Sequence, residues 1–287
     1  MIGVVVSVGL TAIGYFAAWA VLRFRFARPG TLLFRTNVRG IEVPVVLGDA
    51  LVGGALCGIA VLAVLGVWAG AARHLNVTAA VAIALVVMWA AGRWDDKRGD
   101  ERRRGFKGHL GAVRSRSLTG GLVKIGAGFV AGLLVAALIS PNGAPTLRHV
   151  AETVALVGLT ANLVNLFDRA PGRAGKVALL IAVPLMVLGG RDWVLSFAAV
   201  FGALWICLGW DLKEVAMLGD AGANPVGAAL GVGLAEGFPE SGRLIVIVIL
   251  LSLNLASEKW SFSKAIEATP PLRWLDGLGR AGQPSPK

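Results

Sequence analysis

The chain has 287 residues, of which 56% are hydrophobic and only 16% are charged. A soluble globular domain carries about 25% charged residues, so this composition excludes an ordinary water-soluble fold. The net charge of +11 would suggest nucleic-acid binding in a soluble protein. Here the basic residues lie between apolar stretches, which is typical of membrane topology and indicates no nucleic-acid partner.

Nine apolar stretches are long enough, or nearly so, to cross the hydrocarbon core of a bilayer, which needs about 20 residues of helix. In chain order they are 2–22, 45–69, 77–91, 118–139, 150–167, 177–188, 193–210, 225–235 and 244–256. The sixth and the eighth are short. We therefore predict an all-α fold, a polytopic transmembrane bundle of about nine helices.

The loops between these stretches set the expected orientation, because Lys and Arg are enriched on the cytoplasmic side of short loops. Nine crossings place 24 of the 28 Lys and Arg residues on one side, and the four on the other side are Arg73, Arg148, Arg191 and Arg243. We therefore expect the N-terminus outside and the C-terminus in the cytoplasm, in a multi-pass protein of the plasma membrane. Residues 1–257 would form the transmembrane domain.

Residues 258–287 would form a cytoplasmic amphipathic tail. Apolar side chains recur between Trp260 and Leu278, and Pro270 and Pro271 interrupt them. Because proline ends a helix, the tail is expected to form one interfacial helix, a break and a second short piece.

The first polar motif follows the third apolar stretch, in the sequence Gly-Arg-Trp-Asp-Asp at 92–96. Asp95 and Asp96 precede a strongly basic stretch that runs to Arg116. Mg²⁺ prefers carboxylate and phosphate oxygens, so an acidic pair among cations suits a metal-bound diphosphate. The alternative is a solvated pair that Lys97 and Arg98 neutralise at a helix end.

The second motif ends the fifth apolar stretch. Asn162, Asn165 and Asp168 are spaced three residues apart, which places them close to one face of a helix. Polar groups on an apolar membrane helix usually mark function or helix association. The alternative is therefore an interhelical hydrogen-bonding stripe, with Asp168 in water.

The third motif follows the seventh stretch and contains Gly219, Asp220 and Gly222. The two glycines permit close approach of the backbone to a ligand, and Asp220 is expected just before a helix whose N–H groups favour anions. The alternative is that Asp220 is only the N-cap of that helix. With the expected topology, all three motifs emerge on the cytoplasmic face.

In order and placement these motifs resemble those of the polyprenyl-phosphate N-acetylhexosamine-1-phosphate transferases. This is glycosyltransferase family 4, which includes the pentapeptide transferase of peptidoglycan synthesis. GRWDDKRGD resembles the family's Asp-Asp motif, and TGGLVK places Lys124 where the family has a lysine. NLVNLFD is similar to Asn-x-x-Asn-Leu-x-Asp, and LGDAGAN is similar to Gly-Asp-x-Gly-Ser. The resemblance covers most of the chain.

The resemblance implies an Mg²⁺-dependent enzyme of cell-envelope glycan synthesis. A polyprenyl phosphate would attack the β-phosphate of a UDP-sugar, release UMP and leave a lipid-linked diphosphate sugar. Asp95 would activate the lipid phosphate, Asp96 would support Asp95 or the metal, and Asp220 would hold Mg²⁺. Asp168 would act with Asn165 at the nucleotide-sugar. The further candidates for substrate binding are Lys124 at a phosphate, Asn162, Arg169, Arg173, His109, Gly219 and Gly222.

The chain departs from the family after Asp168. Arg169-Ala170-Pro171-Gly172-Arg173 replaces a continuation that carries a second acidic residue, and a His-rich loop expected near the C-terminus is absent. These departures leave open a second function, that of a relative that binds a lipid carrier or a nucleotide-sugar as a regulator or scaffold. The identity of the sugar and the oligomeric state, with a homodimer among the possibilities, are open as well.

Overall fold

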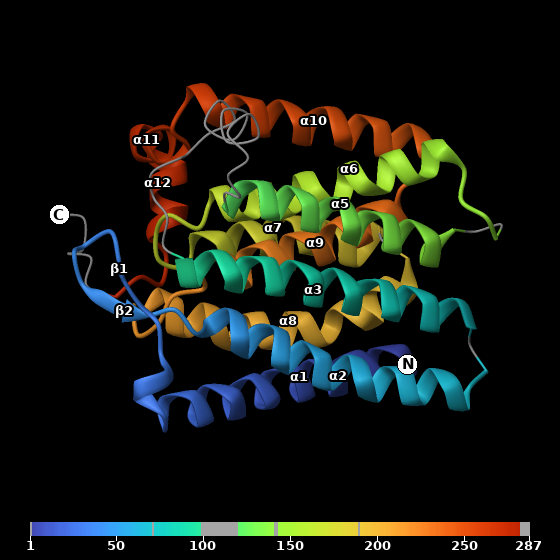
Figure 1. Cartoon of the computed structure of the whole chain (residues 1–287), viewed down its shortest axis with the longest axis horizontal. Coiled ribbons are helices and arrows are strands. Elements are labelled where there is room, and N and C mark those ends of the chain that lie inside the picture. The colour runs from blue at the N-terminus through green and yellow to red at the C-terminus, as the bar shows by residue number, and fades with distance from the viewer. Residues whose placement is uncertain (1, 71, 99–119, 141–142, 189, 282–287) are drawn as a thin grey trace.

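The computed structural model describes residues 2–70, 72–98, 120–140, 143–188 and 190–281. Within them, eleven α-helices lie side by side and mostly parallel to the long axis (Figure 1). Their bounds are α1 Ile2–Phe26, α2 Leu47–Trp68, α3 Ala72–Arg98, α5 Gly120–Ile139, α6 Leu147–Leu166, α7 Arg173–Leu188, α8 Arg191–Leu212, α9 Asp220–Gly237, α10 Glu240–Lys259, α11 Phe262–Ala268 and α12 Pro270–Gly277. A 3₁₀ turn, η1, covers Pro29–Thr31, and two strands, β1 and β2, cover Phe34–Thr36 and Glu42–Pro44.

A helix coincides with each of the nine predicted apolar stretches. Seven of the helices in the described ranges, α1, α2, α3, α5, α6, α8 and α10, are long and apolar enough to cross a membrane. The chain is therefore a multi-pass membrane protein with a helical bundle, as predicted. The shorter α7 and α9 fall outside this set of seven, and the structure fixes neither a count of nine crossings nor the side on which each end lies.

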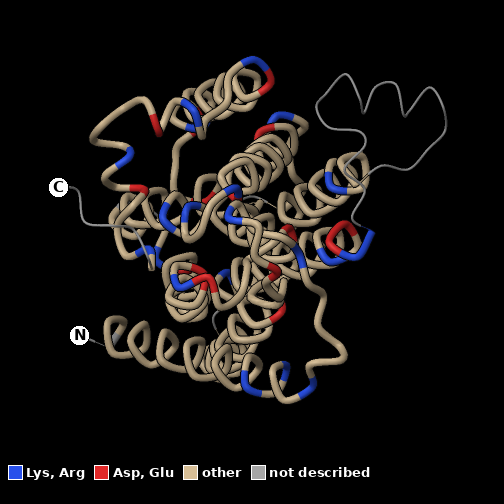
Figure 2. Tube along the Cα trace, turned by 90° about the vertical axis from the view of Figure 1, so that its left-hand side faces the viewer, with Lys and Arg blue, Asp and Glu red and all other residues tan. Residues whose placement is uncertain are grey.

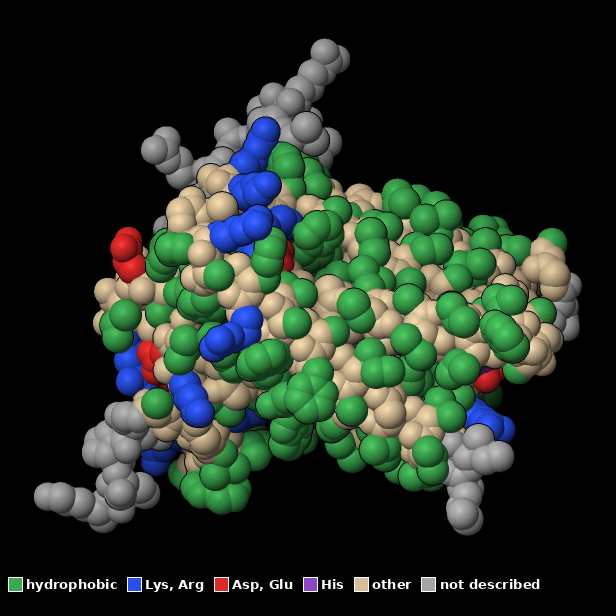
Figure 3. Space-filling view, turned by 90° about the horizontal axis from the view of Figure 1, so that it is seen from below, with side chains coloured by type: hydrophobic (Ala, Val, Ile, Leu, Met, Phe, Trp, Pro, Cys, Tyr) green, Lys and Arg blue, Asp and Glu red, His purple; other side chains and the backbone are tan. Residues whose placement is uncertain are grey.

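The helices alternate in direction, so the same end of the bundle collects the ends of α1, α3, α6 and α8 and the starts of α2, α5, α7 and α9 (Figure 1). We call it the hairpin end, because β1 and β2 pair there as an antiparallel hairpin. Charged residues from several segments gather there (Figure 2), whereas hydrophobic side chains cover the flank of the bundle (Figure 3). All three polar motifs lie at this end.

The hairpin was missed by the sequence analysis, because two strands of three residues give no readable alternation. It fixes the segment before α9, since Met217 donates a backbone hydrogen bond to Pro44 and accepts one from Leu47. The otherwise all-α fold thus contains one small sheet, which connects the N-terminal loop to the third polar motif.

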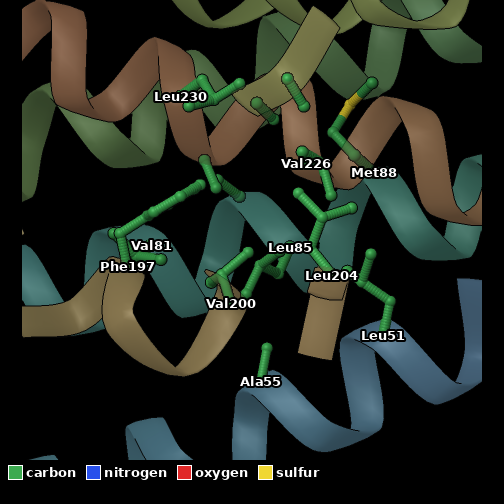
Figure 4. Close-up of a cluster of buried hydrophobic side chains, with 14 of the residues drawn as sticks. Leu51, Ala55, Val81, Leu85, Met88, Phe197, Val200, Leu204, Val226 and Leu230 are labelled. Atoms are coloured by element: carbon green, nitrogen blue, oxygen red, sulfur yellow. The ribbon is translucent and has the colours of Figure 1, made fainter. Parts of the chain in front are cut away.

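Helix α9 is the centre of the bundle, and nearly all of its residues are buried. Its small side chains make it narrow, so neighbouring helices approach it closely, as is usual for packing in membranes. Gly231 shows why, because a Cβ there would lie 2.6 Å from the Cα of Val157 on α6. Leu51, Leu85 and Leu204, from α2, α3 and α8, belong to the same buried cluster as Leu230 of α9 (Figure 4).

Candidate active site

Asp96 joins the end of α3 to the start of α9. Its side chain is 3% exposed, and its two carboxylate oxygens accept hydrogen bonds from the backbone N–H groups of Asp220 (3.2 Å) and Ala221 (3.0 Å). A carboxylate at a helix N-terminus satisfies unpaired N–H groups and interacts favourably with the helix dipole. Asp96 is therefore the residue that caps α9.

This arrangement corrects the predicted place of Asp220. We expected it just before the helix, with an N-cap as the alternative, but Asp220 is the first residue of α9 and Gly219 is the N-cap position. Gly219 has a φ of 67°, a left-handed conformation that favours glycine. Gly222 packs closely on α2, because a Cβ at Gly222 would lie 3.1 Å from the Cα of Gly48. The two glycines thus shape the backbone and its packing.

Lys124 lies between two carboxylates that belong to different helices. Its Nζ is 2.8 Å from Oδ2 of Asp95 on α3 and 2.9 Å from Oδ2 of Asp220 on α9. The two carboxyl groups also hydrogen-bond to each other. Each of the three side chains keeps 20 to 22% of its surface exposed, so a ligand can reach them. Asp95, Lys124 and Asp220, which we call the Lys124 triad, form the centre of the candidate site.

Arg35 on β1 does not touch the triad but contacts the end of α3 that carries Asp95. In the sequence it is only one of the basic residues used to predict the orientation in the membrane. Its Nη2 donates to the backbone carbonyl oxygens of Asp95 (3.3 Å) and Asp96 (2.8 Å). A cation at the last carbonyls of a helix is favourable because the helix dipole is negative there. Arg35 therefore fixes the final turn of α3, from which both aspartates project.

Asp168 follows α6 and lies beside the start of α9, because the backbone N–H of Gly219, the residue before α9, donates to its carboxyl group. Burial, followed by the negative charge of Asp211, raises the pKa of Asp168 well above its usual range. Asp211, which the sequence analysis also missed, is buried and accepts a hydrogen bond of 2.9 Å from the N–H of Gly172. Asp168 thus joins the site as a carboxyl group with a raised affinity for a proton.

The two asparagines of the second motif separate in the structure. The Nδ2 of Asn162 donates to Oδ1 of Asn254 on α10 at 2.6 Å, which is the interhelical contact that we considered as the alternative. Asn165 instead keeps a buried Oδ1 that has no hydrogen-bond partner within the described ranges of the chain. A buried amide oxygen without a partner is unfavourable, so the Oδ1 of Asn165 would gain from a hydrogen-bond donor, whereas Asn162 is held to α10 through its Nδ2.

Arg173, at the start of α7, is bound by the tail. The side chain is 6% exposed. Its Nε and Nη2 donate to the two oxygens of Asp276 at 2.8 Å each, and its Nη1 donates to Ser263 at 2.7 Å. Phe262 of α11 stacks on Phe167, with ring centroids 5.0 Å apart. The tail therefore packs directly on the loop that carries Asp168, as two short helices interrupted at the prolines, as predicted.

Asp276→Asn should release the tail. Burial alone would raise the pKa of Asp276, but hydrogen bonds from Arg173 and the charges of Arg173 and Arg280 outweigh it and hold the pKa below its usual range. Breaking a buried ion pair by removing one partner costs about 3–5 kcal/mol. We expect faster amide hydrogen exchange in 262–277 of the variant at neutral pH, whereas Arg273→Gln, at an exposed position of α12, should leave exchange unchanged.

The pH dependence of the tail follows from the same pair. A carboxyl with a lowered pKa stabilises the docked tail above the pKa of the unfolded chain, about 3.9, and this stabilisation is lost as the pH falls through the pKa of the folded state. After correction for the effect of pH on the intrinsic exchange rate, amide hydrogen exchange of 262–277 in the wild type should therefore approach that of Asp276→Asn only below about pH 4. Equal protection in the two proteins at neutral pH would contradict this role of Asp276.

The residues of the triad fit a magnesium ion in their donor chemistry. Asp95 and Asp220 bring carboxylate oxygens from two helices to one point, where Lys124 already balances part of their charge. In the described part of the chain, no group of three or more His, Cys, Asp and Glu side chains is arranged to hold a metal. Since Mg²⁺ is commonly held by one or two carboxylates together with substrate phosphates, two carboxylates are sufficient.

The structure thus brings together five of the predicted residues, which are Asp95, Asp96, Lys124, Asp168 and Asp220. It places Arg169 on the surface, engages Arg173 with the tail and pairs Asn162 with α10. His109 lies outside the described residues. In comparisons with known proteins, no family model matches the chain and no curated protein matches it.

Proposed function

We propose that the chain is an atypical member of glycosyltransferase family 4, a phosphoglycosyl transferase that acts at the cytoplasmic face of the plasma membrane in cell-envelope glycan synthesis. The observation that carries this proposal is the Lys124 triad, in which carboxylates from α3 and α9 share one ammonium group. Asp168 lies next to it. Phosphoryl transfer depends mainly on positioning and on neutralising charge, and this group of residues can supply both.

In the proposed reaction, an oxygen of the polyprenyl phosphate forms a bond to the β-phosphorus of a UDP-sugar. The bond from that phosphorus to the oxygen that bridges to the α-phosphate breaks, and UMP leaves with this oxygen. The products are UMP and a polyprenyl diphosphate sugar. No oxidant or further reactant is needed.

The residues divide the work by position. Asp95 accepts a proton from, or orients, the lipid phosphate, and Lys124 neutralises phosphate charge between the substrates. Mg²⁺, held by Asp220 and Asp95 together with substrate oxygens, would supply Lewis-acid stabilisation of the phosphates. Asp96 keeps the start of α9 in place through its two backbone hydrogen bonds. Asn165 offers its unpaired oxygen to the nucleotide-sugar.

The cytoplasmic placement of the site rests on charge. Lys and Arg gather at the hairpin end, and the positive-inside tendency places such an end in the cytoplasm. If α7 and α9 cross the bilayer together with the seven longer helices, the nine crossings leave the N-terminus outside. The UDP-sugar would then reach the site from the cytoplasm, where such nucleotides are made.

The proposal predicts UMP release by purified protein incubated with Mg²⁺, polyprenyl phosphate and a panel of UDP-sugars. Asp95→Asn should reduce the rate by about 100-fold or more, which is within the contribution of a positioned acid or base. Asp192→Asn is the matched control, because Asp192 is at the other end of the bundle, next to His74. No release with any donor, or equal release by wild type and Asp95→Asn, would contradict the proposal.

One observation favours the second candidate, a relative that binds a lipid carrier or nucleotide-sugar without turnover. The segment after Asp168 lacks the second acidic residue of the family and adds Arg169 and Arg173, and the tail binds the guanidinium group of Arg173. For this function we expect saturable binding of polyprenyl phosphate or of a UDP-sugar with no UMP release. The same donor panel, followed by equilibrium binding, distinguishes the two functions.

A further inference from the structure

A second group of charged residues lies at the hairpin end, between the end of α1, the start of α2 and the end of α3. Asp49 of α2 is 3.3 Å from Nη2 of Arg25 on α1 and 3.3 Å from Nε of Arg93 on α3. Trp89 of α3 donates its Nε1–H to Oδ1 of Asp49 at 3.0 Å. We call Arg25, Asp49 and Arg93 the Asp49 cluster; it contains two positive charges and one negative charge.

The two guanidinium groups of this cluster are poorly satisfied. Nε of Arg25 and Nη1 of Arg93 are buried and have no hydrogen-bond partner among the residues that the structure describes. The guanidinium group of Arg173, by contrast, is well satisfied, because it donates three hydrogen bonds of 2.7 to 2.8 Å to Asp276 and Ser263. Buried donors without acceptors are unfavourable, and charged ones more so. Besides Asp49, the carbonyl oxygen of Thr31 accepts from Nη2 of Arg25 at 3.4 Å. The Asp49 cluster is therefore only partly hydrogen-bonded and carries one positive charge in excess.

The cluster is separate from the Lys124 triad. Arg93 and Trp89 face α2 through Asp49, whereas Gly92 and Asp96 of the same helix face Asp220 on α9. Different faces of α3 thus serve the two groups. An anion bound at the cluster would not occupy the candidate active site.

The surroundings of the cluster resemble a membrane interface. Aromatic rings are enriched at the level of the lipid headgroups. Here the guanidinium groups of Arg28 and Arg98 each lie 4.1 Å from a ring centroid, over Phe24 of α1 and Trp94 of α3. The side chains of Arg25 and Arg93 remain 21% and 15% exposed, so an anion can reach them from this level.

We propose that Arg25 and Arg93 form a binding site for a phosphate anion, and that a phospholipid headgroup of the membrane supplies it. Guanidinium groups present several N–H donors in a plane and bind phosphate oxygens with charge-assisted hydrogen bonds. A phosphate here accepts hydrogen bonds from the exposed part of the two arginine side chains and balances the second positive charge. The lipid then links the ends of α1 and α3, beside the loop that leads into the hairpin.

The test compares lipid retention by the full chain purified in a neutral detergent. Native mass spectrometry with added phosphatidylglycerol measures its affinity for wild type and for Arg25→Gln/Arg93→Gln. Loss of the guanidinium pair should weaken binding by about tenfold or more, since each charge-assisted hydrogen bond is among the strong ones. Arg28→Gln, two residues after the end of α1, is the control for loss of a neighbouring arginine and should bind as the wild type does.

Because the double variant leaves Asp49 without a cation, a second variant, Arg25→Gln/Asp49→Asn/Arg93→Gln, removes all three charges and should lose the lipid equally.

Inorganic phosphate is the probe for the other source of the anion. If it raises the unfolding temperature of wild type alone, while lipid retention is equal in all proteins, free phosphate is the ligand of the same two arginines. Equal lipid retention together with equal phosphate effects in wild type and both variants would overturn the site. This outcome is independent of any UMP release, so it leaves the proposed reaction untouched.

Discussion

Lys124→Met is expected to reduce UMP release by roughly 100- to 1000-fold, the usual cost of removing one group that stabilises developing charge. The ammonium is the cation that Asp95 and Asp220 share, so its loss removes one of the positive charges that balance these two carboxylates. It also removes the positive charge that the substrate phosphates would meet. Initial rates at saturating donor and lipid measure the effect.

Lys97→Met is the matched control for this variant. Lys97 is exposed on the last turn of the same helix, α3, so its loss changes the net charge equally without touching the triad. Lys124→Arg should retain more activity than Lys124→Met because it keeps the charge. A Lys124→Met protein that is folded and turns over at the wild-type rate would show that the triad has no role in the reaction.

Gly92→Ala should destabilise the protein and reduce activity without changing a charged group. A Cβ at Gly92 would overlap the carbonyl group of Asp220, and backbone atoms at this helix contact cannot move aside as a side chain can. Inserting a methyl group into a packed contact costs typically about 1–3 kcal/mol. The helices α3 and α9 would separate, and with them Asp95 and Asp220.

Thermal unfolding in detergent and UMP release together measure this effect. Gly126→Ala on α5 is the control, because no atom lies within 4 Å of the position of its Cβ and alanine favours a helix more than glycine does. We expect a lower unfolding temperature and lower activity for Gly92→Ala alone. Wild-type values in both measurements would mean that the close contact of α3 with α9 is not needed to form the site.

Much of the fold could be predicted because the bilayer imposes length and apolarity on each helix. The ends of the helices were harder to predict. Helix α3 runs from Ala72 to Arg98, although its apolar stretch covers only 77–91. Its last turns contain Arg93, Asp95 and Asp96, whose polar side chains end the apolar pattern but not the hydrogen bonding of the helix. The apolar pattern therefore located the helix and missed the turns that carry the site.

The site was predictable only in part, because its contacts join residues far apart in the chain. The spacing of Asn162, Asn165 and Asp168 predicted one helical face, but pairing with Asn254 separates the first from the others. In the same way, Asp96 contacts a backbone segment more than 120 residues later in the chain, where it caps α9. No local pattern indicates such a partner.

The arginine-containing segment after Asp168 and the C-terminal tail, which stand in place of two family motifs, contact each other. The sequence predicts Arg173 as a substrate-binding residue and residues 258–287 as a cytoplasmic tail, without indicating a contact between particular residues of the two. In the structure, Asp276 of the tail binds Arg173 through both carboxylate oxygens. A cation near Asp168 and an anion more than 100 residues away thus form one contact, which only the folded chain brings together.

The proposed transfer is tested most directly by following the two phosphates of the donor. UDP-sugar labelled in the β-phosphate should give a labelled lipid, while a label in the α-phosphate should remain in soluble UMP, and Asp95→Asn should form neither product at the wild-type rate. This result distinguishes transfer of the phospho-sugar from transfer of the sugar alone, which would leave UDP in solution. An unlabelled lipid with every donor, or equal labelling by Asp95→Asn, would contradict the proposed reaction.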